Sequence, residues 1–436
     1  MKVGVVVQRY GTDVGGGAEL HARYIAEHVA RHAEVRVLTT CARDYVTWRN
    51  EFPVGIESVN GVAVERFPVA KERDAEDFGR RSTHVFTRQH SLHDELEWLD
   101  SEGPLSPRLI ERVAAARDEF DHLLVFTARY YHAYHAARAV PDRAILVPTA
   151  ERDPALGLGL FAPVFRGVRA IMYNSPEERA SIQAVSSNDH VPGVIVGVGS
   201  DIPQDVDAAR ARRAFAFDGP YVVYVGRIDA NKGCAELFDF FARYVDGHSA
   251  PPLLVLIGTR VLEIPAHPRI RHLGFVDDAD KFDVIAGASA LIMPSYYESL
   301  SMVALEAWAL GTPVIANARC DVLLGQCLRS NGGLYYRTEQ EFAGVMDRIL
   351  DDPDLAGTLG RNGRDYFDRH YSWPVIEGKY LDMFARLTAA PPTHRMEPVP
   401  GWLARRRRTL APATDVVAGL PTGPAMDTAA PRGAIA

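Results

Sequence analysis

Two permanent cations stand five residues apart in the stretch 226–233 (GRIDANKG), directly after the apolar run 221–225. The Arg227 guanidinium offers a fork of donors to phosphate oxygens, and the Lys232 ammonium adds a compact point charge. Together they could neutralise a diphosphate at the junction of a strand and a helix. A surface turn with two solvated cations is the alternative that the spacing alone leaves open.

A second chemical signal comes from two carboxylates. Glu306 lies within the segment 302–310 (MVALEAWAL), and Glu298 precedes it. Glu306 is the one charged residue of this apolar helix, and a buried carboxylate is costly unless it is paired or hydrogen-bonded. We therefore expect Glu306 to meet a ligand hydroxyl or a cation, with a purely structural salt bridge as the alternative. Glu298 precedes the helix in a loop, beside the free amides of residues 300–303, which form a second site for phosphate.

A glycine cluster at 15–17 follows the first apolar run and opens a helix. Its backbone N–H groups can approach an anionic group, although a flexible loop is the alternative. The cluster is not the G-x-G-x-x-G fingerprint, which counts against a nicotinamide-dependent oxidoreductase. Acidic clusters at 277–280 and 351–354 could mimic a metal-binding D-x-D. Because Asp favours both helix caps and turns, we expect helix caps and solvated turns there and no metal site.

Short apolar, β-branched runs must form the strands that position these residues. Their continuous apolarity, without alternation, is typical of strands covered on both faces. Helical stretches lie between many of the runs, and strand followed by helix, repeated, predicts a parallel α/β protein. The predicted strands are 3–7, 35–40, 122–127, 144–149, 168–174, 193–198, 221–225, 253–258, 290–294 and 313–316.

The runs fall into two groups, separated by the polar, charged stretch 200–219. We therefore expect two domains, with a boundary near residue 200. The segment around 371–388 is predicted to be a closing helix, and 389–436 is rich in Pro, Ala, Thr and Gly, which predicts a disordered tail. Four arginines at 405–408 in this tail could touch anionic lipid or nucleic acid, but a solvated run is favoured.

Composition excludes several classes of protein. The 436 residues are 47% hydrophobic and 24% charged, which excludes a disordered, collagenous or coiled-coil chain. A formal charge of −8 argues against nucleic acid as a partner. Four scattered cysteines fit a reducing compartment better than a disulfide framework or a zinc site. The first apolar run is predicted to be a strand and not a signal peptide, so we expect a cytoplasmic protein.

The motifs of the second half resemble one family. The spacing G-R-x4-K-G at 226–233, followed by E-x7-E at 298–306 and by G-T-P at 311–313, looks like a family-4 retaining glycosyltransferase of the GT-B fold, of the bacterial polysaccharide and glycan biosynthesis type. The resemblance covers about residues 1–388. It implies an α/β protein with two Rossmann-like domains whose parallel sheets face across a cleft: an acceptor domain at 1–200 and a donor domain at 201–370, with 371–388 returning to the first.

The resemblance also implies a set of site residues. Arg227 and Lys232 would bind the donor diphosphate, Glu306 the ribose hydroxyls and Glu298 the transferred sugar. The nucleotide-sugar site would comprise Gly15, Gly16, Gly226, Arg227, Lys232, Gly258, Phe275, Val276, Glu298, Ser299, Leu300, Ser301 and Glu306. The family retains anomeric configuration by front-face attack, in which the leaving phosphate helps to deprotonate the acceptor, so Glu298 need not be a nucleophile.

The chain departs from the family pattern at two places. No histidine ends the run 122–127, so His132 is the first-domain catalytic candidate, with His135 a weaker one. Glu151 stands at another place where the resemblance implies a histidine. The sequence Ser-Leu-Ser at 299–301 replaces the Gly-Phe-Gly of many relatives. Backbone amides remain available there, but the sugar preference could differ.

The implied reaction moves a sugar from a UDP- or GDP-type donor onto a glycan or lipid-linked acceptor, without a cofactor or metal. Fixed cations and helix dipoles would stabilise the charge on the leaving diphosphate. A lipid-linked acceptor would bring the protein into peripheral contact with the inner membrane face. The alternatives are a GT-B nucleotide-sugar epimerase, a phosphorylase-like enzyme, and a non-catalytic scaffold that keeps the fold.

Overall fold

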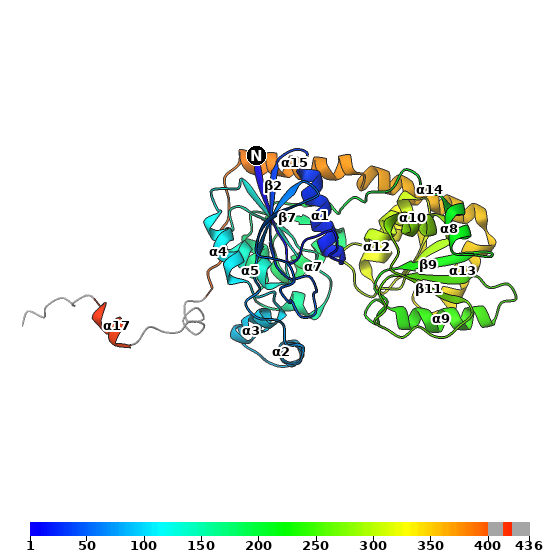
Figure 1. The fold of residues 1–436 in the computed structure, drawn as a ribbon, viewed down its shortest axis with the longest axis horizontal. Coiled ribbons are helices and arrows are strands. Elements are labelled where there is room, and N and C mark those ends of the chain that lie inside the picture. Colours follow the sequence, from blue (N-terminus) through cyan, green and yellow to red (C-terminus); the bar gives the residue numbers. More distant parts are fainter. Residues whose placement is uncertain (400–412, 421–436) are drawn as a thin grey trace, which may run out of the picture. The chain divides into compact units, whose positions relative to one another are not determined.

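The computed structural model describes residues 1–399 and 413–420. The chain divides into a unit of Met1–Met396 and a unit of Glu397–Ala436, and within the latter α17 spans Ala413–Ala418. The four arginines at 405–408 lie outside the described residues. Figure 1 shows the larger unit, which contains two parallel α/β domains.

The first domain is built on a sheet of eight strands in the order β3-β4-β2-β1-β5-β6-β7-β8. All neighbours are parallel except β3, which runs antiparallel to β4 at one edge. The strands are β1 (Lys2–Val6), β2 (Glu34–Thr40), β3 (Gly55–Val59), β4 (Val62–Phe67), β5 (His122–Phe126), β6 (Ala144–Val147), β7 (Ala170–Tyr173) and β8 (Gly193–Ile195).

Helices connect these strands, as expected for parallel pairing. They are α1 (Gly17–Val29), α2 (Ala75–Thr87), α3 (Leu92–Glu102), α4 (Pro107–Ala115), α5 (Tyr131–Ala139), α6 (Ala162–Gly167) and α7 (Pro176–Ser186), with a 3-10 turn, η1, at Pro154–Gly157. The central strands are continuously buried, whereas β3 is mostly exposed. Helices cover both faces of the sheet, and this burial explains why the inner strands consist of continuous apolar residues.

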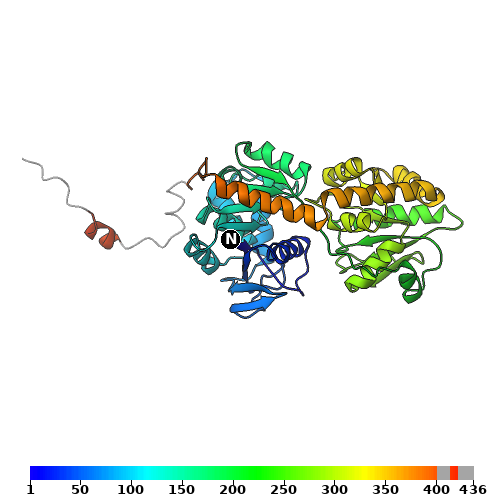
Figure 2. The ribbon, with the colours of Figure 1, turned by 90° about the horizontal axis from the view of Figure 1, so that it is seen from above.

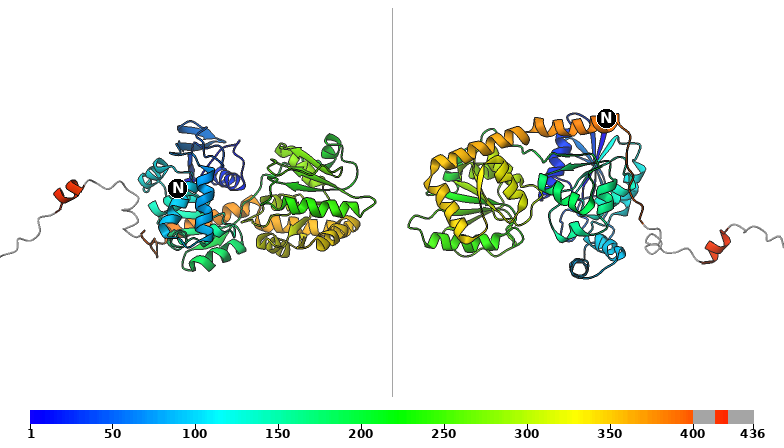
Figure 3. Two further views of the ribbon diagram at one scale, coloured as in Figure 1. Left: turned by 90° about the horizontal axis from the view of Figure 1, so that it is seen from below. Right: turned by 180° about the vertical axis from the view of Figure 1, so that it is seen from behind.

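The second domain contains a wholly parallel sheet in the order β11-β10-β9-β12-β13-β14. Figure 1 shows α9 on one side of this sheet and α8 and α10 on the other, and Figure 3 shows the same layers from two further directions. The strands are β9 (Tyr221–Val225), β10 (Leu253–Ile257), β11 (Ile270–Gly274), β12 (Ala290–Met293), β13 (Val314–Asn317) and β14 (Gly333–Tyr336). The helices are α8 (Ala208–Ala214), α9 (Cys234–Asp246), α10 (Asp278–Gly287), α11 (Met302–Ala309), α12 (Asp321–Ser330), α13 (Glu339–Asp351) and α14 (Pro353–His370).

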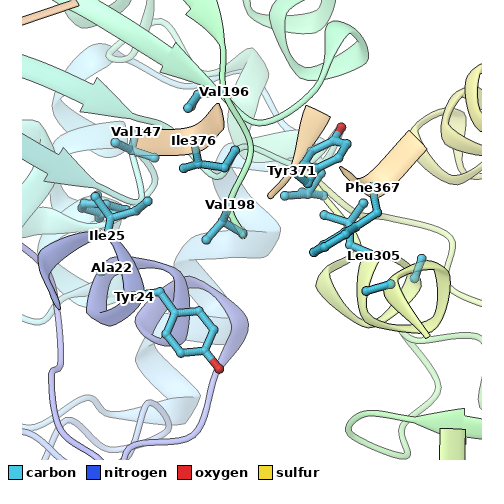
Figure 4. Close-up of a cluster of buried hydrophobic side chains, with 14 of the residues drawn as sticks. Ala22, Tyr24, Ile25, Val147, Val196, Val198, Leu305, Phe367, Tyr371 and Ile376 are labelled. Carbon is cyan, nitrogen blue, oxygen red and sulfur yellow. The ribbon is translucent and has the colours of Figure 1, made fainter. Parts of the chain in front are cut away.

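The last long helix, α15 (Trp373–Ala389), packs against the first domain (Figure 2). It lies beside α1, and the Phe384 ring stacks on His122 with the ring centres 4.9 Å apart. Figure 4 shows the apolar cluster at this junction, where Ile25 of α1, Val147 and Val198 meet Ile376 of α15.

Residues after α15 continue along the first domain. Arg169 donates to the carbonyl of Leu387 at 3.0 Å, and the His394 ring lies 2.6 Å from the carbonyl of Val168. The tail predicted from residue 389 therefore begins with a segment that packs against the first domain, because its backbone carbonyl and ring groups satisfy polar groups beside β7.

All ten predicted strands are present, with ends that differ by up to three residues. The predicted boundary at residue 200 lies between β8 and α8. Four further strands were not predicted: β3, β4, β11 and β14. The parallel α/β fold expected from the repeated strand-and-helix pattern is confirmed.

Candidate active site

The candidate site lies at the switch point of the second sheet, between β9 and β12. The chain leaves these neighbouring strands in opposite directions across the sheet, and ligands of open α/β sheets bind beyond the carboxyl ends of the strands at such a point. The loop after β9 carries Arg227 and Lys232, and the loop after β12 carries Glu298. The Lys232 Nζ lies 2.8 Å from Glu298 Oε1, so the fold brings the two predicted motifs together.

Asp229 orients both cationic residues of the first loop. This buried carboxylate accepts a hydrogen bond from the Lys232 backbone N–H at 3.0 Å and from Arg227 Nε through its other oxygen. Gly233 then turns into α9 with φ 73°, and a Cβ there would lie 2.1 Å from the carbonyl oxygen of Pro294. Glycine is thus required where the two loops touch.

The charge states of the cations follow from these partners. Burial works against the charged form of Lys232, but Glu298 and Glu151 outweigh it and hold the pKa of Lys232 above its usual value. Burial likewise opposes the charge of Arg227, and Asp229 restores it, so that its pKa is also raised. Both side chains are therefore cations at neutral pH, as phosphate binding requires.

Tyr45, in the loop after β2 of the first domain, contacts Arg227. Its hydroxyl accepts a hydrogen bond from Arg227 Nη1 at 2.6 Å, and its ring lies 5.3 Å from the Arg227 guanidinium carbon. Arg9 approaches the same ring at 5.6 Å. One aromatic ring is therefore shared by two guanidinium groups, one from each domain.

Arg9 connects this contact to the predicted glycine loop. It donates to the carbonyl of Gly15 at 3.0 Å and to Glu19 Oε1 at 2.7 Å, and both charged side chains are buried. Gly16 precedes α1 with φ 140°, and a Cβ on it would collide with the Glu19 carboxylate. The glycine loop is thus a fixed turn whose exposed backbone lies on the first domain beside Arg9.

The ends of β9, β10 and β11 carry Gly226, Gly258, Phe275 and Val276 of the predicted nucleotide-sugar site. Gly258 has φ 130°, and a Cβ there would lie 2.1 Å from the Gly226 carbonyl oxygen, so the two glycine backbones approach closely. The Gly258 N–H donates to the Gly274 carbonyl at 2.8 Å. Phe275 follows and is 88% exposed, whereas Val276 packs partly against the core. An exposed aromatic ring beside these strand ends can stack on a flat ligand.

The N-terminus of α11 lies beside Glu298. Ser301 caps the helix by accepting from the Ala304 N–H at 3.2 Å, while Ser299 is half-buried and Leu300 is buried. The capping oxygen serves the Ala304 amide, which leaves the amides of the first turn to face the loop.

Glu306 is buried in α11 and makes the ion pair that was the alternative interpretation. Its Oε1 lies 3.3 Å from Lys281 Nζ, and Lys281 also contacts Asp278 at 3.1 Å. The second oxygen, Oε2, is buried and makes no hydrogen bond. Burial raises the pKa of Glu306 and Lys281 opposes the rise. One carboxylate oxygen is therefore engaged by a cation, and the other is available to a ligand hydroxyl.

A hollow of about 290 Å³ adjoins Glu298 and has walls from both domains. Ala150 and Arg152 come from the loop after β6, and Glu177 and Glu178 from α7. The wall on the other side consists of Tyr296, Tyr297, Glu298, Arg319, Cys320, Asp321 and Val322. Such a hollow beside the two motifs can accept a sugar-sized group.

Glu151 lies in the loop after β6, between Ala150 and Arg152, two residues that line the hollow. Burial raises the pKa of its carboxyl to about 7, with Glu298 and Asp153 adding to the rise and Lys232 and Arg129 opposing it. A carboxyl group that changes charge near neutral pH inside a cleft is a candidate functional group.

His132, the predicted first-domain catalytic residue, is fully buried in α5. Its Nε2 lies 3.0 Å from the Phe126 carbonyl, Nδ1 has no hydrogen-bond partner, and burial lowers the pKa of the ring to about 3. The structure therefore places His132 in the first-domain core, as a neutral ring held against a backbone carbonyl.

The acidic clusters are helix caps, as predicted. Asp277 accepts from the Asp280 N–H at 2.8 Å at the start of α10, and Asp352 accepts from the Leu355 N–H at 3.0 Å at the start of α14. Within residues 1–399 and 413–420, no group of three or more His, Cys, Asp or Glu side chains is arranged to hold a metal ion. In the same part of the chain, no helix has the length and apolarity to cross a membrane.

Sequence reasoning missed Asp229, Tyr45, Arg9 and Lys281 as members of this region. Asp229 was visible between the two cations, and its position could have indicated an orienting role. Tyr45 lies in an irregular loop, and its contact with Arg227 depends on the packing of two domains, so no local pattern indicates it.

The two sheets, the switch-point loops and the returning α15 define a GT-B protein with two Rossmann-like domains. Residues 205–366 match the model of the family described as glycosyl transferases group 1. The structure resembles sucrose-phosphate synthase from Thermosynechococcus elongatus, with a TM-score of 0.66, 21% identity, and coverage of 89% of this chain and 99% of that one. It also resembles Anabaena HepE in complex with UDP-glucose, with a TM-score of 0.63, 15% identity, and coverage of 88% and 100%.

Relatives found by sequence agree with this class. A D-inositol 3-phosphate glycosyltransferase of Corynebacterium urealyticum is 24% identical over 412 residues, which is 88% of this chain and 94% of the relative. An alpha-D-kanosaminyltransferase of Streptomyces kanamyceticus is 32% identical over 178 residues, which is 36% and 44% of the two chains. The fold is therefore that of GT-B structures, and residues 205–366 are similar to the glycosyl transferases of group 1.

Proposed function

We propose that this protein is a family-4-type retaining glycosyltransferase that moves a sugar from a nucleoside-diphosphate sugar, of the UDP or GDP type, onto a glycan or lipid-linked acceptor without a metal. The observation that carries the proposal is the convergence of Arg227, Lys232 and Glu298 at the switch point of the second sheet. Bacterial polysaccharide or glycan biosynthesis, at the cytoplasmic face of the membrane where the acceptor is lipid-linked, is the process it would serve.

Each site residue has a binding role that follows from its chemistry. Arg227 and Lys232 neutralise the diphosphate, and the first-turn amides of α11 add partial positive charge where the leaving group gains negative charge. Glu306 Oε2 accepts from a ribose hydroxyl, since that oxygen is buried without a protein partner. Residues 1–200 hold the acceptor, 201–370 hold the donor, and 371–388 close the first domain.

A thermal-shift screen tests the donor site directly, because a ligand that binds the native state raises its apparent stability. UDP, GDP, ADP, TDP and their common sugar conjugates are compared, each with Mg²⁺ and with EDTA. The expected result is stabilisation by one nucleotide class, equal with and without metal. Stabilisation by none of them would contradict the proposal, and stabilisation only with Mg²⁺ would contradict metal independence.

Product analysis separates the alternative reactions. A transferase releases nucleoside diphosphate only when an acceptor is present and yields a product with the anomeric configuration of the donor, which NMR of the anomeric proton reports. An epimerase would change the sugar without an acceptor, and a phosphorylase-like enzyme would release a sugar phosphate.

A further inference from the structure

The Arg227 guanidinium has two partners, one from each domain. Its Nε donates to Asp229 of the same loop, and its Nη1 donates to the Tyr45 hydroxyl of the first domain at 2.6 Å. Within residues 1–399 and 413–420, Nη2 donates to no protein acceptor. The guanidinium is therefore held through two of its nitrogens, and the third is available to a ligand.

The first domain alone fixes the backbone of Tyr45. The Asp44 carboxylate accepts from the backbone N–H groups two and three residues further on, at 2.7 and 2.8 Å, and closes a turn around Tyr45. The Tyr45 carbonyl accepts from Arg73 Nη1 at 2.9 Å, and Arg73 pairs with the buried Glu102 at 3.0 Å. Because all these groups belong to the first domain, Tyr45 is positioned independently of Arg227.

The Tyr45 ring lies near two guanidinium groups. Its centre is 5.6 Å from the guanidinium carbon of Arg9 and 5.3 Å from that of Arg227. Arg9 is buried, pairs with Glu19 at 2.7 Å and donates to the carbonyl of Arg43 at 2.7 Å, so it is fixed within the first domain. The π face of the ring attracts a cation. The ring and the hydroxyl of one side chain therefore both restrain Arg227.

A side chain that is ordered before its ligand arrives loses less conformational entropy on binding than one that the ligand must order. From these contacts we propose that Tyr45 is a positioning residue of the donor site, whose hydroxyl, supplied by the first domain, sets the Arg227 guanidinium for the donor diphosphate. Arg227 then meets the phosphate oxygens through Nη2. The inference rests on the proposed function, since it requires a diphosphate at Arg227.

The opposite role for Tyr45 would be to block the site by occupying Arg227. A guanidinium has five N–H hydrogens, and the bonds to Asp229 and Tyr45 use two of them. The three that remain are enough for a two-point contact with phosphate oxygens. A neutral hydroxyl also leaves the positive charge of Arg227 in place. These features favour positioning, and the two roles predict opposite changes in affinity.

A further alternative is that Tyr45 acts only by holding the two domains together. Other contacts between the domains serve that purpose. Arg329 of α12 pairs with Glu177 of α7 at 2.5 Å, and Arg152 pairs with Asp321 at 2.7 Å. Arg329→Gln is therefore the matched control, because it breaks a contact between the domains and leaves the cations of the donor site untouched.

Titration calorimetry of the full chain with UDP and with GDP measures the effect. Tyr45→Phe keeps the ring and removes the hydroxyl. We expect its affinity for the nucleotide that the wild type prefers to fall by roughly 3-fold to 10-fold, the cost of ordering one long side chain. Tyr45→Ala also removes the ring and should weaken binding by a further factor of roughly 2 to 5. Arg329→Gln should bind as the wild type does.

Two further measurements assign the effect to Arg227 and to phosphate. In an Arg227→Ala background, Tyr45→Phe should cause no additional loss, since the group that Tyr45 positions is absent. The nucleoside of the preferred nucleotide, which lacks phosphates, should bind the wild type and Tyr45→Phe equally. A loss that persists without Arg227, or that is equally large for the nucleoside, would overturn the inference.

The remaining outcomes separate the alternatives and the two proposals. Tighter nucleotide binding by Tyr45→Phe would assign the blocking role, and an equal loss in Arg329→Gln would assign the effect to the domain contact; either result overturns positioning. Nucleotide binding that is the same in the wild type and Tyr45→Phe overturns positioning and leaves the proposed function intact. Absence of binding by the wild type, together with no thermal shift in the wider screen, overturns both.

Discussion

Lys232 and Glu298 stand 66 residues apart in the chain, and their side chains meet at 2.8 Å where two neighbouring strands end. The Glu298 carboxylate thus already forms an ion pair with the ammonium group that would bind a diphosphate. A bound donor must share Lys232 with Glu298 or displace Glu298 from it. The effect on donor affinity of substituting one of these two residues therefore depends on the other.

Lys232→Ala should weaken binding of the preferred nucleoside diphosphate by about 1.5–3 kcal/mol, or roughly 10-fold to 150-fold in Kd, since a hydrogen bond to a charged group is lost. Part of the loss reflects Glu298, left unpaired beside the phosphates. The double variant Lys232→Ala/Glu298→Gln should recover some affinity. Calorimetry checks both, with the exposed Lys71→Ala as control, and unchanged affinity would remove Lys232 from the site.

Removing the Asp229 carboxylate changes the affinity for nucleoside diphosphate in opposite directions under two explanations, a charge effect and an orienting role. If charge alone mattered, removing this carboxylate would strengthen phosphate binding. Because Asp229 holds Arg227 Nε and the Lys232 backbone N–H, we expect Asp229→Ala to weaken nucleoside diphosphate binding by roughly 10-fold, the cost of losing about one charged hydrogen bond. Asp229→Asn retains the acceptor for Lys232 and should bind with an intermediate affinity. Tighter binding by Asp229→Ala would refute the orienting role.

Glu306→Gln should reduce nucleoside diphosphate affinity by roughly 5-fold to 10-fold, because a neutral amide accepts a ribose hydroxyl more weakly than a carboxylate. The same change removes one partner of Lys281 and should lower the unfolding free energy by about 1–2 kcal/mol. Asp278→Asn is the matched control, as it removes the exposed partner of Lys281 and leaves Glu306 intact. Loss of stability with unchanged affinity would make the ion pair purely structural.

The buried His132 predicts acid sensitivity. Its pKa is lowered from 6.5 to about 3 by burial, so the native state holds the neutral ring. The resulting stability is present above pH 6.5 and is lost as the pH falls below that value toward 3, because the unfolded chain binds the proton first. At pH 5 the loss for one such ring is about 2 kcal/mol.

Urea unfolding at pH 7.5 and pH 5.0 measures this loss. The difference between the two pH values should be about 2 kcal/mol smaller for His132→Gln than for the wild type. His21, also buried with a pKa lowered to about 3, contributes equally to both proteins and cancels. An equal pH difference in the two proteins would show that His132 is not held neutral.

The sequence predicted the inner strands because burial on both faces makes them apolar throughout. It missed β3 and β11, which lie at sheet edges, and β14 at the opposite edge of the second sheet. Their residues are partly exposed and so mix polar with apolar types. β4 alternates buried and half-buried positions, a pattern that a search for continuous apolar runs overlooks.

The candidate site was predictable to the extent that its residues belong to local motifs. Residue type and spacing indicate Arg227 and Lys232 as site residues, and the apolar neighbours of Glu306 indicate that carboxylate. The burial of His132 depends on how α5 packs against β5, and the pairing of Lys281 with Glu306 depends on the packing of α10 beside α11. Such contacts are tertiary, so residue type alone could not indicate them.

The return of α15 to the first domain constrains how this protein can be cut and recombined. Its Phe384 and Leu387 complete the core around β5 and β7, although they are synthesised only after the whole second domain. The first domain is therefore finished last. A chimera that exchanges the second domain needs two splice points, one between β8 and α8 and one between α14 and α15. A stop codon after residue 370 leaves an apolar face of the first domain uncovered.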